Sequence, residues 1–432
     1  MVSFDTFATK RTSFLTSMTS DTSVKIKTDR NVSKRYMSPF PPLRLSPMNT
    51  VELEGLGQRL VARNMGTFES FLFENQSHVD EDQWKFISSE KNIKAYVQHK
   101  RTSESPRKSK CEENSEAEMP ILLVTGTIEG DLDDVMYGII ALTTDQMRIK
   151  TTYTRDGISR SCILATVTPP TYDAPFNSLC VKWSEWHAPI GVRTITNHRD
   201  FVYMEATGFD RLRNGERVGY HLGHSIQFPE TPELDTHIRG NSSVNMFYRQ
   251  RTKNVIDVFI KGFFNSDAGI KRAIIVRSAA RTLLTAGRHV HCGRMKRLSW
   301  VLRHRYSNGA SSIDSEYTEN ASCSSTIDKG CYGCGKKQSL FLQAANRTNQ
   351  GAKILKKKRH CQICTRYICL DCRKQHYVTF LLPNQRLQRR LITICQKCEL
   401  DAFSKSVMTI VRDELLQSDH FLRFNIDDVV RQ

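Results

Sequence analysis

Eight cysteines in the last third of the chain stand at the spacing of metal ligands. They form four pairs whose members are separated by two residues, and each such turn can direct two thiolates at one ion. The other five cysteines are scattered singly, and the first residues show no apolar signal sequence, so the pairs indicate metal binding rather than disulfides. The pairs are Cys331 with Cys334, Cys361 with Cys364, Cys369 with Cys372, and Cys395 with Cys398.

The separations between these pairs predict which of them share an ion. Zinc favours four thiolates in a closed tetrahedron, so eight ligands imply two ions. Only four residues separate the second pair from the third, which is too few for the two to share one ion with ease. We therefore expect an interleaved arrangement of two structural zinc ions, with no open position for catalysis. Cys331, Cys334, Cys369 and Cys372 would hold the first ion, and Cys361, Cys364, Cys395 and Cys398 the second.

Positive charge is concentrated around these cysteines. The whole chain has a formal net charge of +18, and the segment from Cys331 to Cys398 holds fifteen lysines and arginines against one acid. Its densest basic run follows two aliphatic residues, a layout typical of surfaces that enter a bilayer and bind anionic headgroups. A solvated basic loop is the alternative interpretation. The candidate membrane contacts are Ile354, Leu355, Lys356, Lys357, Lys358, Arg359 and His360.

The cysteine spacing and the basic run together resemble the FYVE zinc finger. That family carries R(R/K)HHCR ahead of its third cysteine, where this chain has KKRHCQ at residues 357–362, with His360 kept and Arg359 in place of the first histidine. The family's WxxD motif is absent before Cys331, and its RVC motif is TIC here, at residues 393–395. The resemblance implies a cross-brace fold with two zinc ions that docks on endosomal membranes containing phosphatidylinositol 3-phosphate.

Three other functions stay open at this point. RING fingers of ubiquitin ligases also interleave two zinc ions and act as protein-interaction modules, although they normally include a histidine ligand. Fifteen basic residues would also suit a nucleic-acid backbone, but the segment lacks interleaved aromatic residues and a recognition helix. An enzyme has the least support, because the sequence contains no phosphate-binding glycine loop, nucleophile elbow or open metal site.

A larger domain precedes the cysteines. Alternating apolar residues between 161 and 264 predict a curved antiparallel sheet, and residues 271–302 predict one long amphipathic helix that could cover it. Earlier in the chain we expect a helix from residue 51, strands within 84–100 and 121–130, a charged loop at 101–118, and a helix at 131–147.

This order of elements resembles the START-like helix-grip fold, in which a sheet and a last helix enclose an apolar tunnel for one lipid or sterol. The resemblance implies an α+β domain that holds a hydrophobic ligand without catalysis, and its combination with a FYVE-like finger is typical of a family of oomycete proteins. A closed core is the alternative for any single apolar residue. The candidate cavity residues are Val181, Trp183, Tyr203, Tyr220, Leu222, Met246, Ala279 and Leu283.

The chain is expected to divide into five parts. Because no run approaches the roughly 18 apolar residues that cross a bilayer, we expect a cytoplasmic protein that is peripheral on endomembranes. Its expected partners are anionic phospholipid, a hydrophobic lipid and other proteins, and nucleic acid is disfavoured. The parts are a disordered basic Ser/Thr-rich tail at 1–50, a START-like domain at 51–302, a Ser-rich linker at 303–328, a FYVE-like finger at 329–400 and a helical tail at 401–432.

Overall fold

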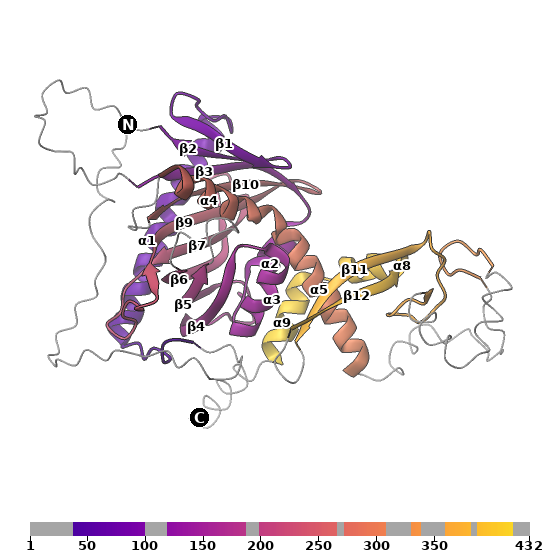
Figure 1. Ribbon diagram of the computed structural model, residues 1–432. Coiled ribbons are helices and arrows are strands. Elements are labelled where there is room, and N and C mark those ends of the chain that lie inside the picture. Colours follow the sequence, from indigo (N-terminus) through magenta and orange to yellow (C-terminus); the bar gives the residue numbers. More distant parts are fainter. Residues whose placement is uncertain are drawn as a thin grey trace, which may run out of the picture. The chain divides into compact units, whose positions relative to one another are not determined.

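The computed structural model describes residues 38–99, 119–186, 198–265, 272–307, 330–337, 359–381 and 387–417 (Figure 1). The chain divides into two compact units, with the boundary between Val290 and His291. The first unit is an α+β structure built on a large antiparallel sheet, and the second contains the paired cysteines. This organisation confirms the expected fold class.

In the described part of the first unit, ten strands form one sheet. Nine of them follow the order β1-β2-β3-β10-β9-β7-β6-β5-β4, and the short β8 pairs in parallel with β6. The first three strands join the others through β10, which pairs with both β3 and β9. The strands are β1 Trp84–Glu90, β2 Ile93–Gln98, β3 Ile121–Glu129, β4 Ile158–Thr168, β5 Ser178–Trp186, β6 His198–Arg211, β7 Arg217–Ser225, β8 His237–Arg239, β9 Asn241–Thr252 and β10 Val255–Asn265.

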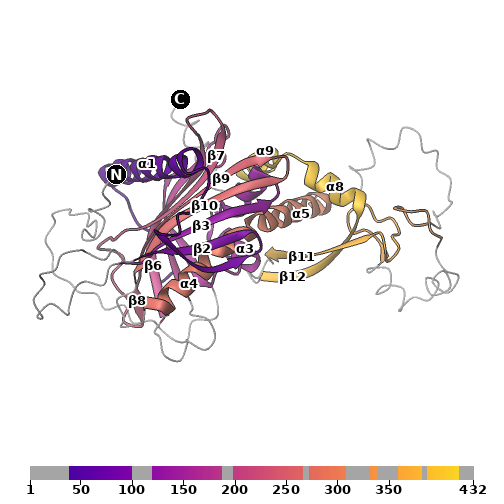
Figure 2. The ribbon, with the colours of Figure 1, turned by 90° about the horizontal axis from the view of Figure 1, so that it is seen from above.

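Helices pack on both faces of this sheet (Figure 2). A side chain at Gly57 of α1 would meet Met204 of β6, whereas one at Gly219 of β7 would meet Met136 of α2. Residues directly opposite each other on neighbouring strands share a face, so the strand register shows which side chains lie under α1. The helices are α1 Pro47–Glu69, continued by a π-helical turn Ser70–Glu74, α2 Leu132–Ile139, α3 Thr144–Thr154, α4 Arg272–Leu284 and α5 His289–Ser307.

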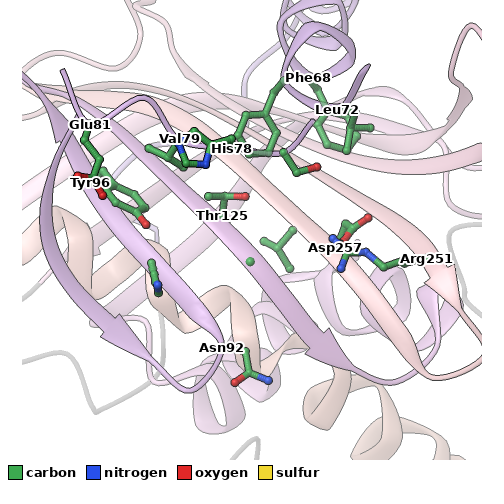
Figure 3. Close-up of a pocket in the computed structure, with 15 residues that line it drawn as sticks. Phe68, Leu72, His78, Val79, Glu81, Asn92, Tyr96, Thr125, Arg251 and Asp257 are labelled. Atoms are coloured by element: carbon green, nitrogen blue, oxygen red, sulfur yellow. The ribbon is translucent and has the colours of Figure 1, made fainter. Parts of the chain in front are cut away.

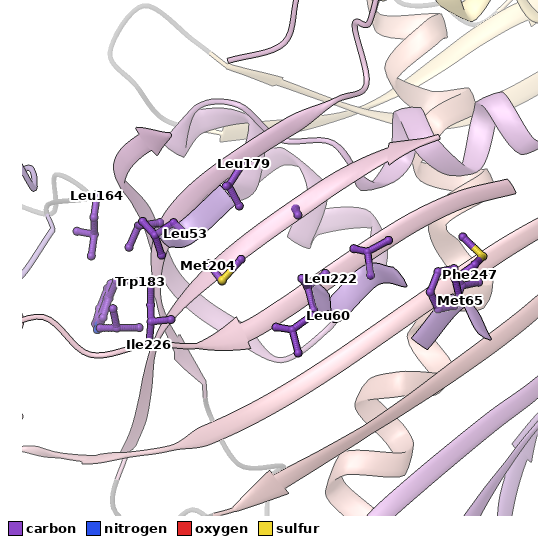
Figure 4. Close-up of a cluster of buried hydrophobic side chains, with 14 of the residues drawn as sticks. Leu53, Leu60, Met65, Leu164, Leu179, Trp183, Met204, Leu222, Ile226 and Phe247 are labelled. Atoms are coloured by element: carbon purple, nitrogen blue, oxygen red, sulfur yellow. The ribbon is translucent and has the colours of Figure 1, made fainter. Parts of the chain in front are cut away.

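The face under α1 is filled by an apolar core (Figure 4). Leu53 and Phe68 of α1 are completely buried against the sheet. The Phe68 ring stacks on Phe247 of β9 with ring centroids 5.5 Å apart. Trp183 and Leu222 lie in the same cluster and are also completely buried. Burial of each such side chain stabilises the fold by about 2 kcal/mol.

The folded region begins earlier than the sequence analysis indicated. Phe40 and Leu43 are buried in the core under α1, and the Leu43 N–H donates to the Leu164 carbonyl of β4 at 2.8 Å. Helix α1 itself begins at Pro47. Residues 38–50 of the expected tail therefore belong to the fold, because their apolar side chains cover the last strand of the sheet.

Helix α4 covers the opposite face of the sheet over strands β1, β2, β3 and β10. The stripe predicted from helical spacing is the buried side of this helix: Val276, Ala279, Ala280 and Leu283 have at most 6% of their surface exposed. This agrees with the expectation that an amphipathic helix packs on the sheet.

The expected single helix at 271–302 is interrupted, which corrects the sequence-based boundary. A 3-10 turn at Thr285–Arg288 separates α4 from α5, and α5 continues to Ser307, into the segment expected to be a linker. Gly287 lies in the turn, where a side chain would come within 3.1 Å of Ile93. Glycine has low helix propensity and permits the close approach, which explains the break at this point.

In the second unit, the last two described helices of the chain, α8 and α9, contact α5. The Trp300 indole donates to Asp413 of α9 at 2.7 Å, and Arg303 pairs with Glu414 at 2.7 Å. The Arg297 guanidinium donates to backbone carbonyls at the end of α8. Residues expected to be a helical tail thus pack on α5 in their described portion. The elements are β11 Arg373–Leu381, β12 Leu387–Cys395, α8 Gln396–Ser404 and α9 Val407–Leu416.

Candidate metal centres and a buried ionic cluster

The eight paired cysteines come together in the two interleaved sets expected from their spacing. Within each set the sulfur atoms lie within 4.8 Å of one another. The Cys334 and Cys369 sulfurs are 3.7 Å apart, and the Cys364 and Cys395 sulfurs 3.9 Å. Four sulfurs bound to zinc at about 2.3 Å form a tetrahedron with edges of about 3.8 Å. Both sets therefore have the size and the donor atoms that a structural zinc ion requires.

Two of the Cys-x-x-Cys turns, Cys331–Gly335 and Cys361–Thr365, are called the first and second knuckle. In each knuckle, backbone N–H groups point at the sulfur of the first cysteine. Cys331 Sγ accepts from Cys369 N at 3.2 Å and from Gly333 N at 3.4 Å. Cys361 Sγ accepts in the same way from Ile363 N at 3.4 Å. Such contacts stabilise thiolate over thiol and orient the ligand toward its ion.

The two knuckles share one backbone conformation although their sequences differ. In the first, Gly335 follows the second cysteine with φ 69°, and in the second, Thr365 occupies the same position with φ 61°. A β-branched residue in this left-handed region costs roughly 1 kcal/mol relative to glycine. The second knuckle therefore carries a local backbone strain that the first lacks.

Of the candidate membrane contacts, only two lie among the described residues. Arg359 and His360 directly precede Cys361, and His360 pairs with Tyr367 in an isolated β-bridge. The Arg359 carbonyl accepts from Ile368 N at 2.9 Å. Residues 354–358 fall outside the described part of the chain. The membrane role of this run stays a prediction.

The hairpin β11–β12 exposes an apolar and basic surface that the sequence analysis did not single out. Tyr377 and Leu391 are directly opposite each other and are 52% and 43% exposed. The Arg389 guanidinium lies 4.8 Å from the centre of the Tyr377 ring. The aromatic and aliphatic residues of 377–381, which follow the two basic residues at 373–374, are the signal that could have indicated this face. No helix in the described part of the chain is long and apolar enough to cross a membrane.

The strand register divides the candidate cavity residues between the two faces of the sheet. Trp183 and Leu222 belong to the core under α1, as do Val181 and, at its edge, Tyr220. Tyr203 is opposite Lys182 on the other face, and Met246 is opposite His221 there. The expectation that all these residues line one cavity with Leu283 and Ala279 is therefore wrong. The residues on the opposite face, and so candidates for a common cavity, are Tyr203, Met246, Ala279 and Leu283.

The face opposite α1 carries a buried ionic cluster. Lys182 and Glu205 are 0% and 3% exposed and form an ion pair between Nζ and Oε2. The Lys182 ammonium also donates to the Ala141 carbonyl at 2.9 Å, and His221 Nε2 donates to Glu205 Oε1 at 3.0 Å. The Tyr203 hydroxyl bonds to Ser184 at 3.0 Å on the same face. Polar side chains thus gather at the centre of an otherwise apolar interior.

Charge compensation determines the protonation of this cluster. Burial raises the pKa of the Glu205 carboxyl, but the charges of Lys182 and Lys150 outweigh it and hold that pKa well below its usual value. Burial lowers the pKa of His221, although Glu205 opposes the change. At neutral pH His221 is therefore neutral and donates through Nε2. Its Nδ1 is a buried acceptor without a partner among the described residues.

Sequence analysis missed the members of this cluster. Lys182 stands between Val181 and Trp183, so its inward position is visible only when the face of the strand is known. Glu205 and His221 come from the next two strands and approach Lys182 through the sheet register. A charged residue inside an apolar strand run is the signal that could have found Lys182.

Among the comparisons with known proteins, only the comparison with solved structures finds similar chains. No family model and no curated protein matches the sequence. Human STARD10 is 11% identical, with a TM-score of 0.38 over 60% of this chain and 88% of that chain. The human StarD13 (DLC2) lipid transfer and protein localization domain is 10% identical, with a TM-score of 0.34 over 58% and 98%. Human StAR-related lipid transfer protein 5 is 14% identical, with a TM-score of 0.33 over 53% and 99%.

Proposed function

We propose that this chain is a non-enzymatic lipid-binding protein that associates with anionic membranes through a two-zinc finger. The observation that carries the proposal is the buried cluster of Lys182, Glu205 and His221 on the sheet face opposite α1. A buried ion pair contributes little net stability compared with apolar residues of similar size. Recognition of the polar end of a ligand gives such a cluster a function in this interior.

The surroundings of the cluster suit an apolar ligand. Tyr203 and Met246 lie in central strands on this face and keep part of their surface exposed, and α4 presents its apolar stripe to the same face of the sheet. The free Nδ1 of His221 would accept a hydrogen bond from a ligand hydroxyl. The alkyl part of the ligand would lie against Met246 and the α4 stripe.

The finger supplies the membrane half of the proposal. Its two sets of four thiolates would hold zinc as a structural ion, so the finger presents a rigid basic surface. The basic run at 356–360 and the exposed Tyr377 and Leu391 combine the charge and apolar area that anionic bilayers attract. Docking on phosphoinositide-containing endomembranes, with a cytoplasmic location, is the resulting proposal.

Uptake of lipid from vesicles tests the first half. Full-length zinc-loaded protein is expected to withdraw a fluorescent phosphatidylcholine or sterol from donor vesicles. Met246→Trp should lower the amount bound at least tenfold, because the larger side chain would occupy the proposed ligand position beside the cluster. Met48→Trp is the matched control, because Met48 is 66% exposed on α1. Equal uptake by the two variants, or no uptake of any lipid by the wild type, would contradict the proposal.

Flotation with vesicles tests the second half. Replacing Lys356, Lys357 and Lys358 by alanine should weaken binding of the full-length protein to acidic vesicles by on the order of 100-fold, since each basic residue near the surface contributes about 1 kcal/mol. A control variant with Arg59, Lys85 and Lys253 changed to alanine removes the same charge from exposed sites of the first unit and should bind normally.

The composition of the vesicles separates selectivity from charge. Stronger flotation with phosphatidylinositol 3-phosphate than with phosphatidylserine at equal surface charge would support headgroup recognition. Equal flotation with the two lipids would show that the finger binds acidic membranes through charge alone, without selecting a headgroup. Flotation that does not depend on acidic lipid at all would refute the membrane half.

A further inference from the structure

A cavity of about 390 Å³ lies on the α1 side of the sheet (Figure 3). It is bounded by the end of α1 and the π-helical turn, by the loop that follows, and by strands β2, β3, β9 and β10. The proposed lipid site is on the opposite face of the same sheet. The cavity is therefore a separate candidate site, and its size is within the range of small-molecule pockets.

One wall of the cavity is apolar. Phe68 at the end of α1 and Phe71 in the π-helical turn are buried. Leu72 and Val79 lie near Phe68 and keep part of their surface exposed (Figure 3). Tyr96 faces them from β2. Leu72, Val79 and Tyr96 therefore offer a surface on which an aromatic or branched aliphatic group can pack.

The far end of the cavity contains charges that neutralise one another. The Asp257 carboxylate accepts from Arg249 at 2.8 and 3.1 Å and forms an ion pair with Arg251 at 2.6 Å. Arg249 pairs in addition with Glu216 at 3.0 Å. Two arginines are thus balanced by two acids, so this group provides hydrogen-bonding capacity without a net charge.

Two further charges of the cavity lining have no such compensation. Lys94 and Glu81 both line the cavity at its solvent-exposed side, and neither has an ion-pair partner among the described residues. Lys94 is two residues from Tyr96 on the same face of β2, opposite Thr125 of the cavity floor. Glu81 lies beside Tyr96 (Figure 3). Burial, and secondly the Glu81 carboxylate, raise the pKa of the Tyr96 phenol, which agrees with this proximity.

We propose that this cavity binds a small zwitterion with an apolar group, of the class of a free aromatic or branched amino acid. The ligand carboxylate would pair with Lys94 and its ammonium group with Glu81. Its side chain would pack on Leu72, Val79 and Tyr96, which line the cavity and keep part of their surface exposed. A ligand with one charge would leave either Lys94 or Glu81 without a partner in the complex. Opposite charges together with an apolar wall therefore select this class over simple acids and amines.

A matched set of three probes tests the proposal on the full-length zinc-loaded protein at neutral pH. L-phenylalanine carries both charges, phenethylamine has only the ammonium group, and 3-phenylpropanoate has only the carboxylate. Calorimetry or ligand-observed NMR is expected to show that phenylalanine binds about fivefold more tightly than either analogue, because an ion pair with an exposed side chain contributes up to about 1 kcal/mol. Glycerophosphocholine, a zwitterionic lipid headgroup without an apolar group, should bind more weakly than phenylalanine.

Variants assign the contacts. Lys94→Ala should reduce affinity for phenylalanine and 3-phenylpropanoate about fivefold and leave phenethylamine unchanged. Glu81→Gln should reduce affinity for phenylalanine and phenethylamine and leave 3-phenylpropanoate unchanged. Thr125→Tyr should abolish binding of all three by filling the cavity. Lys85→Ala is the control, since Lys85 is exposed on the adjacent strand and does not line the cavity.

The proposal is overturned if none of the probes binds more tightly than about 1 mM, or if the three bind equally. It is overturned too if Thr125→Tyr, with an unchanged melting temperature, leaves binding intact, or if glycerophosphocholine matches phenylalanine. Failure of lipid uptake by the opposite face leaves this test unaffected, because the two sites share no lining residue.

Discussion

Removal of two zinc ions is expected to unfold the cysteine-rich segment while the sheet of the first unit stays folded. Structural zinc contributes about 10–16 kcal/mol of binding free energy in small fingers, far more than the few apolar residues of this segment can replace. Hydrogen exchange before and after chelation should show protection lost in β11 and β12 and retained in β5, β6 and β9. Elemental analysis of the native protein should give two zinc ions per chain. Retained protection in β11 after complete chelation would refute a structural role.

Pairs of serine substitutions distinguish the interleaved arrangement from a sequential one. Cys331→Ser with Cys369→Ser affects one site and should leave one zinc ion bound, whereas Cys331→Ser with Cys361→Ser affects both sites and should leave none. In a sequential arrangement, the first two Cys-x-x-Cys pairs would hold one ion and the last two the other. The first double variant would then lose both ions and the second only one. Cys323→Ser changes a cysteine that belongs to none of the four Cys-x-x-Cys pairs of the sequence, so it serves as the control that should keep two ions bound.

Breaking the buried ion pair is expected to produce the second-largest effect. Lys182→Met leaves the Glu205 carboxylate buried without its cation and should destabilise the first unit by about 3–5 kcal/mol in urea unfolding. Adding Glu205→Gln should recover most of this loss, because the two neutral side chains no longer require compensation. Lys85→Met, at an exposed position, should cost less than about 0.5 kcal/mol. A double variant as unstable as Lys182→Met alone would count against the pair as a charged unit.

The pH dependence gives an independent measure of the same interaction. The pKa of Glu205 is lower in the folded protein than in the unfolded chain, so its contribution to stability is complete above the unfolded value of about 4.3. This contribution is lost as the pH falls below that value and through the folded pKa. Glu205→Gln should therefore lose less stability on acidification than the wild type. Parallel curves for the two proteins would show that Glu205 does not titrate in this way.

The cysteine sites could be predicted almost completely from the sequence. Each Cys-x-x-Cys turn is local, and the preference of zinc for four thiolates leaves few ways to combine four pairs. The positive φ at Thr365 was beyond sequence reasoning, because threonine does not signal a left-handed conformation. It follows from the shared geometry of the two knuckles.

The boundaries of the larger domain were predicted less well. The proline-rich segment around Phe40 reads as a solvated tail, yet its two buried side chains complete the core beside β4. The break at Thr285–Arg288 interrupts a pattern with continuous helical spacing. In both cases a tertiary contact outweighed the local preference, because burial of an apolar side chain contributes more than local propensity.

The sequence by itself determined the antiparallel sheet with an amphipathic helix and the two sets of four cysteines, because periodicity and cysteine spacing are local properties; the order of these elements implied the α+β class through its START-like resemblance. Only the tertiary structure decided which strand face lies under α1 and which lies opposite it. Alternation shows that Trp183 and Lys182 point in opposite directions, but not which of them meets which helix. That choice depends on the pairing of distant strands, and it places Lys182, Glu205 and His221 together on one face and the cavity beside Lys94 on the other.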